Sequence, residues 1–105
     1  AQKYLMDHGY EIIALNFRTP EGEIDIIAKN KMGIVFTEVK TRSNTSLEYP
    51  EESITDTKLE HMVICAEWYM IQHPELDENW RIDVIAIIGR MVEQNPSIEW
   101  FQDVA

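Results

Sequence analysis

Two apolar, strand-like segments with a carboxylate in the middle constrain this chain most strongly. The first covers residues 22–29 and carries Asp25, and the second covers residues 34–42 and carries Glu38. Side chains of a strand alternate between two faces, so each carboxylate shares a face with one apolar and one charged neighbour two residues away. A charge in such a place needs a cation or a proton nearby. The pattern predicts two adjacent strands whose charged residues meet.

The register of these strands follows from the polar residues between them, which end in a glycine as a four-residue hairpin loop does. The predicted antiparallel pairs are Ile27 with Phe36, Asp25 with Glu38, and Glu23 with Lys40. Like charges directly opposite each other destabilise a sheet unless a cation lies between them. Mg²⁺ binds through one or two carboxylates plus waters. We therefore expect a metal held by Asp25, Glu38 and the Val39 carbonyl, with Lys40 beside it.

A simpler interpretation is a salt-bridge cluster in which Lys40, Arg42 and Glu23 neutralise the two acids at the protein surface. Against it, the opposite face of both segments is also apolar, which favours central strands whose charged end borders a cleft. Its residues are Ile24, Ile26, Ala28, Val35, Thr37 and Val39. Both interpretations stay open on these patterns alone.

The run Gly22-Glu23-Ile24-Asp25-Ile26-Ile27-Ala28, followed by Val35-Phe36-Thr37-Glu38-Val39-Lys40-Thr41-Arg42, resembles the YraN-type family of small bacterial proteins. Similar residues recur at Tyr4-Leu5, Gly9-Tyr10, Asn16-Phe17-Arg18, Pro50, Lys58 and Arg81-Ile82-Asp83-Val84-Ile85. The resemblance implies a restriction-endonuclease-like fold. It also implies that Asp25, Glu38 and Lys40 correspond to the PD-(D/E)xK nuclease motif, in which the acids bind Mg²⁺ and the lysine positions or activates the attacking water.

Two features depart from that family. Its members usually carry a further metal-site glutamate three residues before the position of Ala1, so the resemblance implies a chain truncated at its N-terminus. Nine Lys and Arg against nineteen Asp and Glu give a net charge of −10, whereas nucleic-acid binders usually have a basic surface.

Arg42 and Lys58 are the expected phosphate contacts near Lys40, and Glu23 is expected to hold Lys40.

Composition sets the remaining limits. A chain of 105 residues with 45% hydrophobic content predicts a single domain. The resemblance implies that this domain, residues 1–105, is nuclease-like. The single cysteine, Cys65, excludes an internal disulfide and is expected in or near the core. Neither a signal peptide nor an apolar run of about 18 residues is present, which predicts a cytoplasmic protein without a membrane segment.

Periodicity predicts the order of the elements. Helices are expected over residues 1–8 and 52–73, the second capped by Ser53 or Thr57, and strands over 10–18, 22–29, 34–42, 80–88 and 98–101. The first three strands form a meander, and the long helix crosses over to a fourth strand parallel to the third. This order predicts an α/β sandwich with a mixed five-stranded sheet. The resemblance implies that its class is the restriction-endonuclease-like three-layer sandwich, in which helices flank that sheet.

Several other residues invite functional interpretations. Asp83 is either a functional acid or, as we favour, the partner of a neighbouring Arg or Lys. Trp80 and Trp100 are expected to pack against a helix rather than stack on a base. His61 and His73 are expected to be exposed, because their spacing does not suggest a zinc site.

The charged residues of the two strands, together with the resemblance, imply a metal-dependent endonuclease that hydrolyses DNA phosphodiester bonds with Mg²⁺ or Mn²⁺. The alternative is a non-catalytic module that keeps the nuclease fold and binds nucleic acid or protein, which the charge of −10 supports. A third class is an acidic structural protein in which the charged cluster is only a salt-bridge network.

Overall fold

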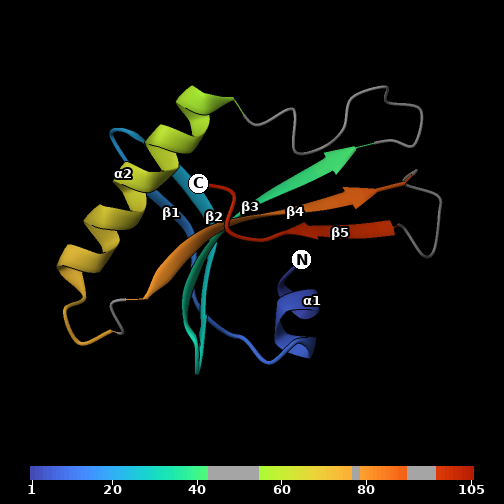
Figure 1. Cartoon of the computed structure of the whole chain (residues 1–105), viewed down its shortest axis with the longest axis horizontal. Coiled ribbons are helices and arrows are strands. Elements are labelled where there is room, and N and C mark those ends of the chain that lie inside the picture. The colour runs from blue at the N-terminus through green and yellow to red at the C-terminus, as the bar shows by residue number, and fades with distance from the viewer. Residues whose placement is uncertain (43–54, 77–78, 90–96) are drawn as a thin grey trace.

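The computed structural model describes residues 1–42, 55–76, 79–89 and 97–105 as an α/β structure (Figure 1). Its elements, in chain order, are α1 (Gln2–Asp7), β1 (Glu11–Thr19), β2 (Gly22–Asn30), β3 (Gly33–Arg42), α2 (Asp56–Gln72), β4 (Trp80–Ile88) and β5 (Ser97–Phe101). The predicted order of a helix, three strands, a helix and two strands is therefore confirmed.

The five strands form one mixed sheet in the order β1-β2-β3-β4-β5. β1, β2 and β3 pair antiparallel, β4 runs parallel to β3, and β5 pairs antiparallel with β4. The hairpin register is as predicted where the strands pair, with Ile27 opposite Phe36. β3 is the central strand of the sheet, with β2 on one side and β4 on the other. Glu38 and Lys40, which lie on one face of β3, are therefore flanked by both of these strands.

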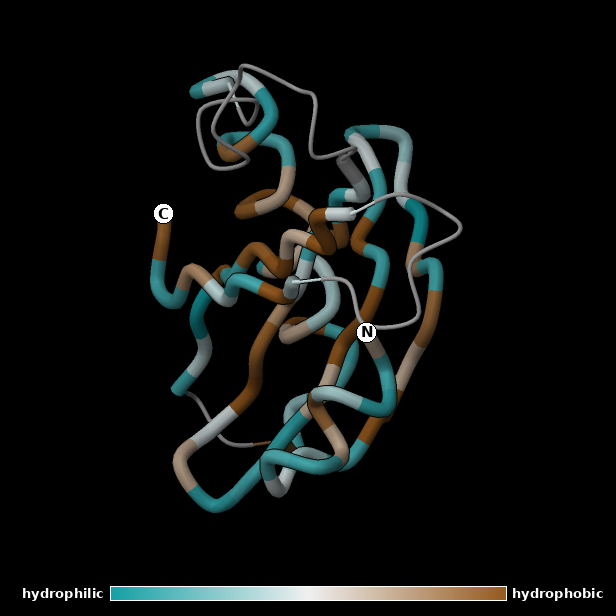
Figure 2. Tube along the Cα trace, turned by 90° about the vertical axis from the view of Figure 1, so that its right-hand side faces the viewer, coloured by the Kyte–Doolittle hydropathy of each residue, from teal (hydrophilic) through white to brown (hydrophobic). Residues whose placement is uncertain are grey.

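Two apolar clusters lie on opposite faces of the sheet, because Val35 and Phe36 are consecutive residues of β3 and belong to different clusters. The α2-side cluster contains Ile24, Ile27, Ile34, Phe36, Met62, Cys65, Ala66, Tyr69 and Ile82. The α1-side cluster contains Leu5, Tyr10, Ile26, Ala28, Val35 and Ile85. Figure 2 shows where apolar residues (brown) and hydrophilic residues (teal) lie along the chain. The sheet is the middle layer between the two helices.

The alternation of side chains in β2 changes phase at Asp25. Ile24 packs in the α2-side cluster and Ile26 in the α1-side cluster, although side chains two residues apart on a regular strand share a face. The neighbouring part of β1 is irregular as well: Asn16 has φ +50°, a left-handed conformation that asparagine tolerates better than most residues. The prediction that Ile24 lies on the face of Ile26 is therefore wrong.

The helix α2 begins at Asp56, directly after Thr55. Its N-cap is Thr55, whose side chain accepts a hydrogen bond of 3.1 Å from the Lys58 amide. Thr57 lies within the helix, so its predicted role as the cap is wrong, and Ser53 lies outside the described residues. Cys65 is buried in the core, as predicted. Within the described ranges, no helix is long and apolar enough to cross a membrane.

Candidate active site

The Asp25 side chain lies where the pairing between β2 and β3 ends. The last paired residues of this ladder are Ile26 and Thr37. Beyond them, the backbone amide of Val39 donates a hydrogen bond of 2.8 Å to Oδ2 of Asp25. The carboxylate thus takes the place that a β2 carbonyl would occupy in a continued ladder, which fixes it next to Glu38. The predicted direct pairing of Asp25 with Glu38 across the ladder is therefore replaced by this side-chain contact.

Glu38 is the buried carboxylate of the site, and two lysines approach it. Its side chain is only 8% exposed, and its Oε1 lies 3.6 Å from Nζ of Lys40 and 3.5 Å from Nζ of Lys58. Lys40 comes from the same face of β3, two residues along. Lys58 comes from the first turn of α2, which Thr55 caps. Lys58 therefore approaches the charged end of the sheet.

The ionisation of Glu38 reflects these neighbours. Burial raises the pKa of the Glu38 carboxyl above its usual value, and the negative charge of Asp25 raises it further. The positive charges of Lys58 and Lys40 act in the opposite direction without cancelling the rise. Like-charge repulsion between two carboxylates in a partly buried place is the situation that a bound cation relieves.

Two other predicted site residues are Glu23, which pairs away from Lys40, and Arg42, of which the structure describes only the backbone. Glu23 forms an ion pair with Arg18 of β1, at 3.4 Å, so the prediction that Glu23 pairs with Lys40 is wrong. The reason is the phase change at Asp25 together with the end of the β2–β3 ladder, which removes the expected alignment of the two strands. Arg42 is the last residue of β3, where its backbone pairs with Ile88. Its side chain lies outside what the structure describes.

The donor set fits a hard divalent cation. Asp25 and Glu38 offer carboxylate oxygens, and the Val39 carbonyl is the third predicted ligand. No group of three or more His, Cys, Asp or Glu suited to a metal occurs among the residues placed by the structure. A dedicated all-protein cage is thus missing from that part of the chain. Mg²⁺, however, commonly binds through one or two carboxylates and completes its shell with water and substrate phosphates.

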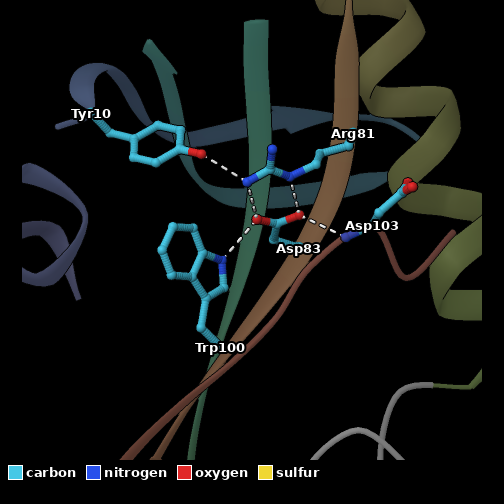
Figure 3. Close-up of polar contacts among 5 residues, drawn as sticks. All are labelled: Tyr10, Arg81, Asp83, Trp100 and Asp103. Carbon is cyan, nitrogen blue, oxygen red and sulfur yellow. Dashed lines mark hydrogen bonds and ion pairs between the residues drawn. The ribbon is translucent and has the colours of Figure 1, made fainter. Parts of the chain in front are cut away.

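Asp83 belongs to a separate polar network on the α1 side of the sheet (Figure 3). Its fully buried carboxylate accepts hydrogen bonds from Nε of Arg81 at 2.9 Å, from Nε1 of Trp100 at 2.7 Å and from the Asp103 amide at 2.9 Å. Nη2 of Arg81 also donates to the Tyr10 hydroxyl at 2.7 Å. The favoured interpretation of Asp83 as the partner of a neighbouring arginine is confirmed.

Trp80 and Trp100 both pack against other aromatic rings, and His61 and His73 differ in exposure. Trp100 meets the rings of Tyr4 in α1 and of His8, the C-cap of α1, edge-on, as expected for packing against a helix. Trp80 meets Phe36 edge-on within the α2-side core. His61 is exposed, whereas His73 is half-buried and stacks on Tyr69 at 4.0 Å between ring centroids. The prediction of an exposed His73 is wrong, because the end of α2 turns this ring back onto the helix.

Comparison with known proteins identifies relatives over most of the chain. The model of Uncharacterised protein family UPF0102 matches residues 1–87. A UPF0102 protein of Caldicellulosiruptor bescii is 44% identical over 88 residues, which cover 83% of this chain and 74% of the relative. A UPF0102 protein of Desulfosudis oleivorans is 41% identical over 90 residues, or 86% of this chain and 73% of the relative. A Clostridium novyi relative is 36% identical over 103 residues, or 98% and 86%. The chain therefore belongs to the UPF0102 family, as the resemblance to YraN-type proteins predicts.

Proposed function

We propose that this protein is a restriction-endonuclease-like enzyme that hydrolyses phosphodiester bonds in DNA with Mg²⁺ or Mn²⁺. The observation that carries the proposal is the gathering of Asp25, Glu38 and Lys40 at the place where β2 and β3 separate. Asp25 is held there by the Val39 amide, and Glu38 contacts Lys40. Two carboxylates and a lysine at one strand end supply the groups that metal-assisted hydrolysis of a phosphodiester requires.

Each residue has a proposed role. Asp25, Glu38 and the Val39 carbonyl hold the cation, which when bound lowers the pKa of water and offsets negative charge on the scissile phosphate. Lys40 orients the attacking water or stabilises negative charge that develops on the phosphate. Glu38 keeps the Lys40 ammonium in place through their ion pair. The hydrogen bond from Val39 keeps one oxygen of Asp25 directed toward β3.

The substrate side of the proposal rests on the cations around this site. Lys58 brings a second ammonium group to Glu38 from α2, and its side chain is 37% exposed, so it can reach a phosphate at the surface. Arg42, four residues after Glu38 on β3, is the second proposed phosphate contact. A local positive potential of this kind can attract DNA even when the net charge is unfavourable.

A second candidate is a non-catalytic module that keeps this architecture and binds nucleic acid or protein. The observation that favours it is the net charge of −10, which opposes association with a polyanion over the whole surface. In this case Glu38 with Lys40 and Lys58 would be a structural ion-pair cluster, and the site would bind no cation.

The test is cleavage of linear duplex, single-stranded and four-way-junction DNA in Mg²⁺ and in Mn²⁺. The protein is compared with Lys40→Ala and with Lys29→Ala, purified identically. Lys29 is the matched control because it is a β2 lysine that pairs with Glu11 instead of Glu38. We expect metal-dependent cutting that Lys40→Ala abolishes and Lys29→Ala preserves. Cutting that survives in Lys40→Ala would refute the assignment, and DNA binding without any cutting would favour the non-catalytic module.

A further inference from the structure

The outward side of α2 carries an apolar stripe that does not belong to the core. Ile64, Trp68 and Ile71 are 36%, 50% and 79% exposed. Their spacing of four and three residues places them on one side of the helix. The buried side of α2, formed by Met62, Cys65, Ala66 and Tyr69, packs against the sheet. The three exposed residues, which we call the α2 stripe, therefore face away from it.

The α2 stripe differs from scattered surface apolar residues, which are normal in soluble proteins. The other large exposed hydrophobic residues in the described ranges are spread over separate elements: Met6 on α1, Leu15 on β1, Met32 in the β2–β3 turn and Ile98 on β5. The α2 stripe is contiguous and has a half-exposed tryptophan at its centre. Tryptophan, with tyrosine and arginine, is enriched among the residues that contribute most binding energy in protein interfaces.

The surroundings of the α2 stripe are acidic. Glu60 and Glu67 are exposed on the same helix, and Asp56 and Glu75 are exposed at its two ends. The single lysine of α2, Lys58, points to Glu38 in the site described above, and the helix contains no arginine. An apolar stripe with an acidic border complements a surface that is apolar in the middle and basic at its border.

Charge also discriminates among the occupants of this surface. A second copy of the chain would bring these glutamates against their own equivalents, in a protein whose net charge is −10. Nucleic acid and anionic lipid are negatively charged, as the border of the α2 stripe is. They therefore offer no basic groups to pair with its glutamates. Ile64 and Ile71 are seven residues apart, or about 10 Å along the helix, which suits a small interface rather than an obligate dimer.

We propose that the α2 stripe docks a protein partner that presents an apolar groove bordered by lysine and arginine. Trp68 inserts into the groove, Ile64 and Ile71 extend the apolar contact along the helix, and Glu60 and Glu67 meet the basic border. The surface is distinct from the Asp25–Glu38 site, so docking here does not depend on the proposed nuclease activity.

The probe for this chemistry is a synthetic amphipathic helical peptide made only of leucine and lysine, compared with a leucine–glutamate peptide of the same pattern. Binding is followed by anisotropy of the labelled peptide and mapped by ¹⁵N shifts of the protein backbone. We expect the lysine peptide to bind at least tenfold more tightly than the glutamate peptide and to shift α2 amides. Trp68→Gln should weaken binding at least fivefold. Met6→Gln, which changes an exposed apolar residue of α1 on the other face of the sheet, should leave it unchanged.

A double variant, Glu60→Gln with Glu67→Gln, tests how much the acidic border of the α2 stripe contributes to peptide binding. This protein should bind the lysine peptide several-fold more weakly and with a shallower dependence on salt, and circular dichroism should show the same helix content. No binding of the lysine peptide, equal binding of both peptides, or equal binding by Trp68→Gln would overturn the proposal. Sedimentation that shows a dimer which Trp68→Gln dissociates would also overturn it, because a second copy would then be the occupant.

Discussion

The Asp25 carboxylate accepts a hydrogen bond from the Val39 amide, at 2.8 Å, just beyond the end of the β2–β3 ladder. This contact gives Asp25 two functions. It satisfies a main-chain donor that has lost its ladder partner, and it places a negative charge beside Glu38. The two functions can be separated by substitution.

We predict that Asp25→Ala destabilises the protein by about 1–3 kcal/mol, because the part-buried Val39 amide loses its acceptor. Asp25→Asn keeps an acceptor oxygen and should cost less than Asp25→Ala while still removing the charge. Urea denaturation of the three proteins measures the difference. Equal destabilisation by both variants would show that the charge, and not the hydrogen bond, accounts for the structural contribution of Asp25.

The raised pKa of Glu38 predicts a pH-dependent stability. Burial and the charge of Asp25 raise the pKa of the folded carboxyl above 4.5. The folded state therefore holds this proton at pH values where the unfolded chain has lost it. The stability contributed by the protonated carboxyl is fully present below about 4.5 and is lost as the pH rises through the folded pKa.

Glu38→Gln should mimic the protonated carboxyl at every pH. We expect this variant to be more stable than the parent at pH 7 to 8, with a difference that disappears as the pH falls toward about 4.5. Chemical denaturation over this pH range tests it, with Glu99→Gln as a control that removes an exposed carboxylate of β5. A Glu38→Gln protein less stable than the parent at neutral pH would mean that the ion pairs with Lys40 and Lys58 outweigh burial.

Lys58 should have opposite effects on cation binding and on DNA binding. Its ammonium group lies 3.5 Å from Oε1 of Glu38, where it repels a divalent ion bound to the same carboxylate. We predict that Lys58→Met raises Mn²⁺ affinity at pH 8 by up to about tenfold, or 1.4 kcal/mol, and lowers affinity for DNA. Calorimetry and DNA anisotropy measure the two effects, with Lys58→Arg as the variant that keeps the charge. A loss of both affinities would instead make Lys58 a structural support of Glu38.

The buried network around Asp83 is predicted to support the fold without entering the chemistry. Arg81→Met leaves the fully buried Asp83 carboxylate without its cation and should cost about 2–4 kcal/mol, in the lower part of the range for breaking a buried pair, because Arg81 is itself 27% exposed. Tyr10→Phe removes one hydrogen bond to the guanidinium group and should cost about 1 kcal/mol. Thermal and urea denaturation measure both. Loss of Mn²⁺ binding in folded Tyr10→Phe would contradict the separation of this network from the site.

The sequence predicts the strands and the hairpin register well, because alternation and the turn at residues 30–33 are local signals. The crossover by α2 and the parallel β3–β4 pairing follow from element order. The partner of Glu23 could not be predicted in this way. The predicted pairing of Glu23 with Lys40 requires regular alternation through Asp25. The left-handed conformation of Asn16 and the end of the ladder, which accompany the loss of this alternation, are properties of the folded sheet.

Contacts between distant residues are the other class that the sequence does not reveal. The hydrogen bond from Arg81 to Tyr10 joins residues that are 71 positions apart, and no periodic pattern relates them. The Arg81–Asp83 pair, two residues apart on one strand, was predictable for that reason. In the candidate site, Lys58 was predictable only as a lysine on the sheet-facing side of a helix, and the Thr55 cap that places its turn was not.

The most direct test of the account is Mn²⁺ binding followed by electron paramagnetic resonance, because it asks whether Asp25 and Glu38 form one cation site. We predict a single site of low-millimolar affinity or better that Asp25→Asn and Glu38→Gln each abolish. Glu23→Gln, which changes the carboxylate that pairs with Arg18 instead, should bind Mn²⁺ as the parent does. No Mn²⁺ binding by the folded parent, or binding that survives in Asp25→Asn and Glu38→Gln, would contradict the account.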